Sequence, residues 1–345
     1  MLRLAIFAAS LLAASSAAAL PLYTVTDLGS AAQINNEGQV IGGNVLWDPT
    51  GGITVLPGTA IDIDNHGRVL GDGWVWDATV GVTALPADVR NPRAMNDLGQ
   101  IVGQGPSPTG GYNGGYLWDP VLGFTPIVNP LLGGPPTGSG ADVLFHDLDN
   151  LGRVVGTAAM GEPAPAYWDP SLPAAELLRT QSGALAGSAT AVNDRGQIVA
   201  AGLVADPIIG SREGCDGHFC RKAIVWDDPT AAYVIAAGAA YDINDSGWVV
   251  GSRDYCAADP LFCVEGYSRA FAWNDLDGLV DLSSLVISSD PHYGTSFLTA
   301  NAINNNGWIL ADNRYLLRPV PEPTTVSMLV VGLLALCVRR RRNAA

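Results

Sequence analysis

Positive charge is scarce in this sequence, and lysine is almost absent. Its 345 residues include 18 Lys and Arg against 33 Asp and Glu, a net charge of −15, and Lys222 is the single lysine. A surface that binds nucleic acid needs clustered cations to meet the phosphates. We therefore expect no nucleic-acid partner, and the acidic balance favours solubility and repulsion from anionic surfaces.

Stretches free of helix breakers are also lacking. Glycine and proline number 41 and 23, and in a helix interior they cost about 1 and about 3 kcal/mol each. This argues against a helical bundle. Hydrophobic residues make up 48% of the chain. This is enough apolar surface to form a buried core, which argues against a disordered acidic tail. The composition predicts a turn-rich, all-β protein.

Common catalytic motifs are missing, since the chain contains no HExxH, GxSxG or P-loop pattern. Asp62-Ile63-Asp64 and the run from Asp242 to Gly247 resemble the first half of a calcium loop. Their twelfth positions, Gly73 and Arg253, lack the glutamate that such a loop requires. We expect no enzyme, no catalytic residue and no metal site, with calcium as the one cofactor left open.

Residues 1–19 have the features of a secretory signal peptide. Arg3 is their single charge, an apolar run extends from Leu4 to Leu12, and Ala17 and Ala19 fit the A-x-A cleavage rule. We expect cleavage after Ala19 and export, rather than a buried N-terminal helix.

Residues 319–345 carry three features in order: Val320, Pro321, Glu322 and Pro323, then an apolar run from Val326 to Val338, then Arg339, Arg340, Arg341 and Arg342. The apolar run is shorter than the ~20 residues that span a bilayer comfortably. The arginines would stay on the cytoplasmic side.

This order resembles the PEP-CTERM sorting tail of Gram-negative bacteria. The resemblance implies export, a transient transmembrane helix in the inner membrane and cleavage by an exosortase near Pro321-Glu322-Pro323. The mature protein would then reach the cell surface or the exopolysaccharide matrix. An ordinary, unprocessed C-terminal membrane anchor is the alternative.

The body, residues 20–318, is a repeat. An apolar stretch, two residues of the Asn/Asp type, any residue, a glycine and an apolar, mostly β-branched pair recur seven times. The first Asn or Asp can bond the backbone two residues on, and the glycine can take positive φ and form a G1 bulge. Each motif predicts a tight β-hairpin. The turns are 35–38, 64–67, 96–99, 149–152, 193–196, 244–247 and 304–307.

A third strand ends in an aromatic residue, which in six copies is a tryptophan followed by Asp or Asn and in the seventh is Tyr315. We expect these side chains to pack between repeats, and a ligand-stacking row is the alternative. The tryptophans are Trp47, Trp76, Trp118, Trp168, Trp226 and Trp273.

A fourth strand follows in most repeats, but the seventh repeat ends without one, and residues 23–28 supply a spare strand. The prediction is a seven-bladed β-propeller closed by the N-terminal strand, because closure removes sheet edges. An open β-solenoid is the alternative.

The segment Arg269-Ala270-Phe271-Ala272-Trp273 is close to the second half of a known repeat signature. The repeat resembles the HAF family of extracellular repeats, whose signature runs from Ile-Asn-x-x-Gly through Val-Val-Gly to His-Ala-Phe-x-Trp. Its histidine occurs in none of the seven copies. The resemblance implies an exported β-repeat protein and no particular chemistry.

Spacing between the motifs varies widely, which predicts long loops gathered on one face of the ring, where binding function usually lies. We expect this face to bind polysaccharide or a surface protein. The alternatives are neutral insertions, or an extracellular enzyme that acts on glycan through carboxylates in the central channel. The predicted loops are 104–114, 129–143, 157–165, 203–222, 252–269 and 285–299.

Five cysteines are present, and Cys337 lies in the apolar tail. The others form two close pairs, Cys215 with Cys220 and Cys256 with Cys263. In an exported protein such pairs predict disulfides. Local pairing is simplest, while cross-loop bridges and a metal site that includes His218 are the alternatives.

Overall fold

The structure is a computed structural model that describes residues 20–106, 113–127, 143–160, 162–180, 183–184, 186–203, 221–256 and 266–321. The predicted signal peptide, the sorting residues from Glu322 onward, and Cys215, Cys220 and Cys263 lie outside these residues. Cys256 ends a described strand, and no disulfide joins the described side chains. In the described part of the chain, no helix is long and apolar enough to cross a membrane.

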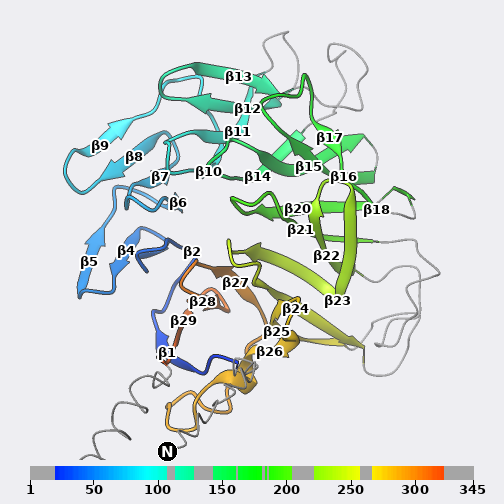
Figure 1. Ribbon diagram of the computed structural model, residues 1–345. Helices are drawn as coiled ribbons and strands as arrows, with labels where there is room; N and C mark the ends of the chain where they lie inside the picture. The colour runs from blue at the N-terminus through cyan, green and yellow to red at the C-terminus, as the bar shows by residue number, and fades with distance from the viewer. Residues whose placement is uncertain are drawn as a thin grey trace, which may run out of the picture.

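The described chain is all-β except for one 3-10 turn, η1 (Leu282–Leu285), and its sheets fan out around a common centre (Figure 1). All strand pairs within the sheets are antiparallel. Four of the four-stranded sheets follow chain order. They are β2 (Gln33–Ile34), β3 (Val40–Gly42), β4 (Val45–Asp48) and β5 (Gly52–Val55); β6 (Ala60–Ile63), β7 (Val69–Gly71), β8 (Trp74–Asp77) and β9 (Gly81–Ala84); β10 (Pro92–Met95), β11 (Ile101–Pro106), β12 (Asn113–Asp119) and β13 (Gly123–Ile127); and β14 (Val143–Leu148), β15 (Val154–Met160), β16 (Glu162–Trp168) and β17 (Glu176–Leu177).

A fifth four-stranded sheet joins the two ends of the chain, in the order β1 (Tyr23–Asp27), β29 (Tyr315–Pro319), β28 (Ile309–Ala311) and β27 (Ala300–Ile303). Strand β1 pairs with β29 from Tyr23 opposite Pro319 to Asp27 opposite Tyr315. The predicted closure by the N-terminal strand is therefore confirmed, and an open solenoid is excluded.

The prediction of seven four-stranded blades is wrong, because the propeller arrangement has five such blades. Where the sequence predicts the fifth and sixth blades, one seven-stranded sheet forms. Its strands are β20 (Ala186–Val192), β21 (Ile198–Leu203), β22 (Arg221–Asp228), β23 (Ala231–Ile243), β24 (Val249–Cys256), β25 (Gly266–Asn274) and β26 (Gly278–Asp281). A separate pair, β18 (Arg179–Thr180) and β19 (Gly183–Ala184), lies outside these sheets.

The long strand β23 is the physical cause of this difference. It pairs with β22 through its first half and with β24 through its second half, so no loop separates the two repeats. Gly238 lies at the junction with φ 126°, and a Cβ there would stand 2.0 Å from the carbonyl oxygen of Ser252. Only glycine allows the two strands to approach this closely.

Gly238→Ala should therefore destabilise the protein by about 2 kcal/mol or more, because the new methyl group meets backbone that cannot move aside. The matched control is Gly278→Ala in the same sheet, where φ is 70° and no atom lies within 4 Å of the added Cβ. The control should lose only the ~1 kcal/mol of left-handed backbone strain. Chemical denaturation of both variants measures the difference, and equal losses would contradict this account of the junction.

The second strand of every repeat forms the core. Each apolar pair after a turn, from Val40 and Ile41 to Ile309 and Leu310, is at most 1% exposed. These strands are covered on both faces because neighbouring sheets pack face to face around the ring. Full burial of such a side chain contributes roughly 1.5–3 kcal/mol, so the seven pairs contribute substantially to stability.

The six predicted tryptophans also belong to the cores, as the sequence predicts. Trp168 and Trp226 are buried, and the other four pack against core clusters. None of the six is among the exposed large hydrophobic residues, so they form no exposed ligand-stacking row.

The two faces of the ring differ. The seven Asn/Asp-Gly turns lie on one face, which we call the turn face. Opposite lies the hairpin face, on which the second and third strands of a repeat are connected. The pairs that extend toward it are β11–β12, β15–β16, β21–β22 and β24–β25. Several predicted loops on the hairpin face are longer strands instead: residues 157–160 and 162–165 are paired in β15 and β16, as are 252–256 and 266–269 in β24 and β25.

Candidate functional site

The seven turns form a closed ring around the central axis. In six of them, the side-chain oxygen of the first residue accepts backbone N–H groups from the third and fifth residues, and in the turn at 35–38 Asn35 accepts the N–H of the fifth residue, Gln39. In all seven, the fourth-position glycine has φ between 74° and 84°. The five four-stranded blades contribute one turn each, and the seven-stranded sheet contributes two.

Neighbouring turns are joined in two different ways. Where the first residue is asparagine, its Nδ2 donates directly to a carbonyl of the next turn, as Asn96 does to Asp149 over 2.8 Å. Where the first residue is aspartate, the arginine four residues later makes the bond to the next turn instead. Arg68 pairs with Asp64 and donates through Nη2 to the carbonyl of Asp97 over 2.8 Å. Arg153 does the same for Asp149. The bond from Asn304 to the carbonyl of Asn35 closes the ring.

A second ring runs through the second turn residues. Each backbone N–H donates to the Oδ1 atom of the corresponding residue in the next turn, over 2.7–2.9 Å, and Asn305 donates to Asn36. The members are Asn36, Asn65, Asp97, Asn150, Asp194, Asp245 and Asn305. These two rings fix the mouth of the channel on the turn face.

Below the rings lies a cavity of about 230 Å³, lined by the first strand of every repeat. Three aspartates, each two residues before a turn, face it: Asp62, Asp147 and Asp242. Each accepts one backbone N–H from its own strand and one from the next first strand around the ring. Asp62, for example, accepts from Met95 over 2.7 Å.

Burial of these carboxylates is the main influence on their ionisation. It raises the pKa of Asp62 to about 7 and that of Asp242 to about 6, and it raises the pKa of Asp147 well above the usual range. The backbone N–H bonds oppose this shift, while repulsion between the aspartates adds to it at Asp62 and Asp147. The channel therefore holds carboxyl groups that change charge near neutral pH.

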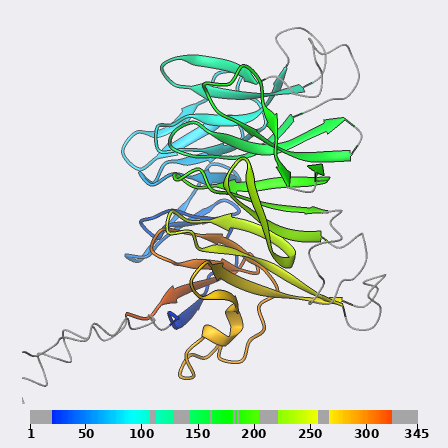
Figure 2. The same ribbon diagram turned by 45° about the vertical axis from the view of Figure 1, so that its right-hand side comes forward.

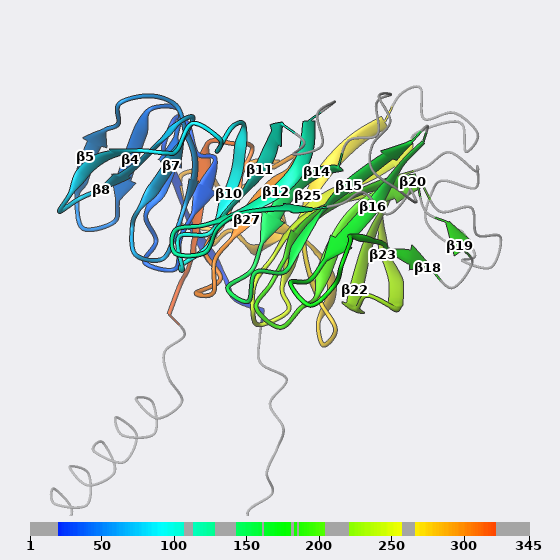
Figure 3. The same ribbon diagram turned by 90° about the horizontal axis from the view of Figure 1, so that it is seen from above.

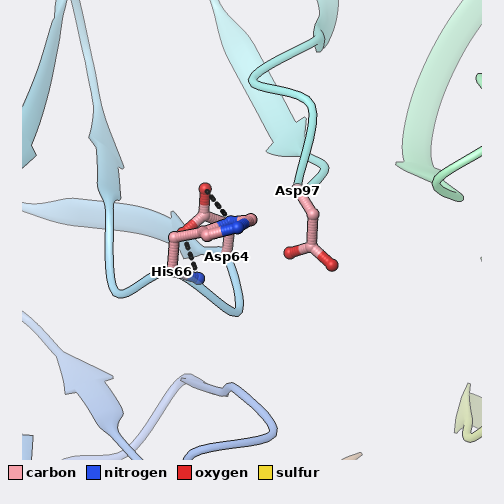
Figure 4. A group of neighbouring side chains, drawn as sticks. All are labelled: Asp64, His66 and Asp97. Atoms are coloured by element: carbon pink, nitrogen blue, oxygen red, sulfur yellow. Dashed lines mark hydrogen bonds and ion pairs between the residues drawn. The ribbon is translucent and has the colours of Figure 1, made fainter.

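One group of possible metal ligands occurs among the described residues: Asp64, His66 and Asp97, whose ligand atoms lie within 4.8 Å of one another. Figure 4 shows Asp64 and His66 on one turn and Asp97 on the neighbouring hairpin. Asp64 is buried and paired with Arg68. Asp97 accepts bonds from Asn65 and from Asn150. A cation would have to compete with Arg68, so these groups are explained by the turn rings.

A different cluster lies at the tip of the β24–β25 hairpin, on the hairpin face. The rings of Tyr255 and Tyr267 are stacked with centroids 5.0 Å apart and planes at 8°. The guanidinium of Arg253 lies 4.7 Å from the ring centre of Tyr255, and that of Arg269 lies 5.4 Å from the ring centre of Tyr267. We call these four residues the Arg–Tyr tip.

The strand register explains the cluster. Arg253 is opposite Arg269, and Tyr255 is opposite Tyr267. Residues two apart share one side of a strand, so all four side chains lie on one side of the hairpin. Asp254 lies on the other side, where it accepts the Ser268 hydroxyl over 2.9 Å and stands 3.8 Å from Arg221.

The Arg–Tyr tip and the chain ends are on opposite faces. Strand β24 runs away from the turn at 244–247, so its end lies at the hairpin face. Strand β29 runs the other way, and Pro319 pairs with Tyr23 at the turn face. Figure 3 shows the described ends of β1 and β29 leaving on one side, with the yellow hairpin reaching the other side. Figure 2 shows this hairpin projecting beyond the shorter blades.

Two of the predicted sorting residues, Val320 and Pro321, fall in the described part. The Val320 N–H donates to the carbonyl of Leu22 over 2.7 Å, so the sorting motif begins directly at the last strand pair. Neither the channel position of Asp62, Asp147 and Asp242 nor the Arg–Tyr tip was predicted from the sequence. A signal for the aspartates was present, because aspartate and alanine alternate at this position from the second repeat to the seventh, while the first repeat has Gln33. The alternating residues are Asp62, Ala94, Asp147, Ala191, Asp242 and Ala302.

Comparison with known families matches residues 319–342 to the PEP-CTERM protein-sorting motif. This motif implies an exported protein that an exosortase processes, with a fate at the cell surface or in association with the membrane. No curated protein matches the chain.

Among solved structures, the chain is similar to YCF48 bound to a D1 peptide, with 14% identity, 89% of this chain and 97% of that chain covered, and a TM-score of 0.46. It is similar to TolB from Acinetobacter baumannii at 11% identity, 87% and 63% coverage and a TM-score of 0.40. It is also similar to the β-propeller domain of the trilobed protease from Pyrococcus furiosus at 12% identity, 78% and 100% coverage and a TM-score of 0.35.

Proposed function

We propose that this exported protein is a non-enzymatic binding protein of the cell surface or the exopolysaccharide matrix, and that it holds extracellular glycan on its hairpin face. The observation that carries the proposal is the position of the Arg–Tyr tip opposite the chain ends. Because the sorting motif begins at residue 319, the turn face is on the membrane side while the tail is attached. The hairpin face then points outward, toward the matrix.

The channel supports the same choice over a glycan-cleaving enzyme. Its cavity of about 230 Å³ is smaller than the ~300–1,000 Å³ of typical small-molecule sites. Both oxygens of each channel aspartate already accept a backbone N–H that ties neighbouring strands together. In this proposal, these carboxylates have a structural role: each one links two neighbouring first strands of the ring. The resemblance to HAF-type repeats agrees with an exported scaffold.

The test is binding of the purified exported protein to a panel of neutral and acidic polysaccharides, with release of reducing ends followed in the same samples. We expect binding without release. The variant Asp62→Asn with Asp242→Asn should bind as the wild type does, since the channel plays no part. Release of reducing ends that this variant abolishes would instead establish the enzyme, and binding to no polysaccharide would overturn the proposal.

A further inference from the structure

We propose that Leu98, Val121, Leu122 and Leu151 form a membrane-contact patch on the turn face, which meets the lipid surface of the membrane that holds the sorting tail. We call these four residues the turn-face patch. This inference rests on the orientation of the ring in the proposed function, and glycan binding plays no part in it. Three features carry it: the exposure of the patch, its place across the ring from the chain ends, and the short chain between the ring and the apolar tail.

The patch lies on three turns that are joined to one another. Two are the turns at 96–99 and 149–152, and Asn96 joins them by its bond to the second turn over 2.8 Å. The third turn connects β12 and β13, and Asp119 in it accepts a bond from Gln100 over 2.8 Å. Because β12 ends opposite the start of β11, this turn also lies at the turn face. Four apolar side chains are therefore gathered on one sector of that face.

The patch side chains are strongly exposed, at 59–88%, whereas Leu203, Tyr267 and Leu298 at the hairpin face are 38–53% exposed. Single exposed hydrophobic residues are common on protein surfaces, but neighbouring ones mark a site of contact. The backbone N–H groups of all four patch residues already donate to the first Asn or Asp of their turns. The patch can therefore enter an apolar interface without burying these donors unpaired.

The chain ends lie across the ring from the patch. Figure 1 shows the β10–β13 sheet and the sheet that contains β1 and β29 on opposite sides of the common centre. The patch and the end of β29 are both at the turn face. A ring that is held by its tail on one side and by apolar side chains on the other has its turn face parallel to the membrane.

Little chain separates the ring from the apolar tail. The Val320 N–H donates to the carbonyl of Leu22, and the apolar run begins at Val326. An extended chain covers at most about 3.6 Å per residue, so six residues reach about 22 Å. The turn face therefore stays close to the lipid surface while the tail is inserted. This closeness selects lipid as the occupant of the patch.

The charge of the body selects the lipid headgroups. Residues 20–318 carry 13 basic and 32 acidic residues, and this balance repels an anionic surface. Attraction must therefore come from apolar contact, which grows with the apolar area that enters the interface. We expect the patch to contact zwitterionic lipid and to lose contact as anionic lipid is added.

The experiment uses the full exported chain with its tail, inserted in vesicles of phosphatidylethanolamine and phosphatidylcholine that contain a trace of lipid with a photoactivatable acyl chain. Illumination attaches this lipid to the protein groups that touch it, and mass spectrometry of peptides locates the adducts. The patch variant is Leu98→Ser with Val121→Ser and Leu122→Ser. The matched control, Leu203→Ser with Leu298→Ser, removes exposed apolar side chains from the hairpin face. Circular dichroism checks the fold of each variant.

We expect adducts on the three patch turns of the wild type and none on the β24–β25 hairpin. The patch variant should lower labelling of the turn at 149–152 about tenfold, while the control variant should keep the wild-type pattern. Replacing part of the lipid with phosphatidylglycerol should lower labelling of the patch in the wild type.

Adducts on the tail alone, or equal labelling of the turn at 149–152 in the wild type and the patch variant, would overturn this inference. Association of the chain in detergent that the patch variant abolishes would overturn it in favour of contact between two copies. Each of these results leaves the proposed glycan binding standing, because the polysaccharide panel measures that binding without a membrane.

Discussion

Asn96→Asp should destabilise the protein by about 3 kcal/mol or more, and adding Gln100→Arg should restore most of that loss. Asn96 is 5% exposed, and its Nδ2 donates to the carbonyl of Asp149 and to Oε1 of Gln100, each over 2.8 Å. A carboxylate at this position would place a buried charge against two oxygens, which costs as much as breaking a buried ion pair.

The rescue follows from the other turns of the same ring. In the turns at 64–67 and 149–152, aspartate occupies the first position, and the arginine four residues later pairs with it. The arginine then lies over the glycine of the next turn, as Arg153 does over Gly196. Gln100 already lies against Gly152, so an arginine there has the same space.

A double-mutant cycle by urea denaturation measures this coupling. Gln100→Arg alone is the control, and it should cost about 1–2 kcal/mol because it loses the bond from Gln100 to Asp119 and the bond that Gln100 accepts from Asn96, while Asn96 keeps its bond to the carbonyl of Asp149. The double variant should lie within about 1 kcal/mol of the wild type. If it is no more stable than Asn96→Asp alone, the two kinds of turn linkage are not interchangeable and this account of the ring is wrong.

Local chemistry made the hairpins and the core predictable. Glycine in the fourth position of a turn, and the apolar pair after it, are read within a few residues, and both occur as predicted in all seven copies. The pairing of residues 23–27 with β29 was also predictable. The seventh repeat lacks a fourth strand and the N-terminus has one without a repeat, so the N-terminal strand completes the seventh repeat.

The seven-stranded sheet was missed, although its signal is local. Several other links between repeats contain proline, as at Pro57 and Pro86, whereas β23 passes between its two partners through Ala236, Ala237, Gly238 and Ala239. A stretch of small residues without a turn former continues a strand.

The candidate sites needed the three-dimensional ring. Asp62 and Asp242 are 180 positions apart in the sequence and face one cavity only because the strands circle an axis. Tyr255 and Tyr267 meet because β24 and β25 pair in one register. The length of a long connection does not fix that register, so the sequence alone could not bring the two rings together.

Stability should rise as the pH falls from about 8 to about 5.5, and the channel aspartates are the cause. A carboxyl group whose pKa is higher in the folded state than in the unfolded chain binds its proton more tightly when folded. Its stabilising contribution is complete below the unfolded pKa, near 3.8, and is lost as the pH rises through the folded pKa. For Asp242 and Asp62 that loss centres at about pH 6 and about pH 7. Each pKa unit corresponds to about 1.4 kcal/mol, so the change should reach several kcal/mol.

Asp62→Asn tests the assignment, with Asp77→Asn as its matched control. Removing the Asp62 carboxyl should flatten the dependence of unfolding free energy on pH by up to one proton, about 1.4 kcal/mol per pH unit. Asp77 is partly exposed, and its bonds from Thr79 lower its pKa, so it titrates below this window and its variant should keep the wild-type slope. Burial and the nearby Arg93 lower the pKa of His146. Urea denaturation at a series of pH values measures the slopes. A wild-type slope of zero, or an Asp62→Asn slope equal to the wild type, would show that the channel carboxyl groups do not titrate near neutral pH.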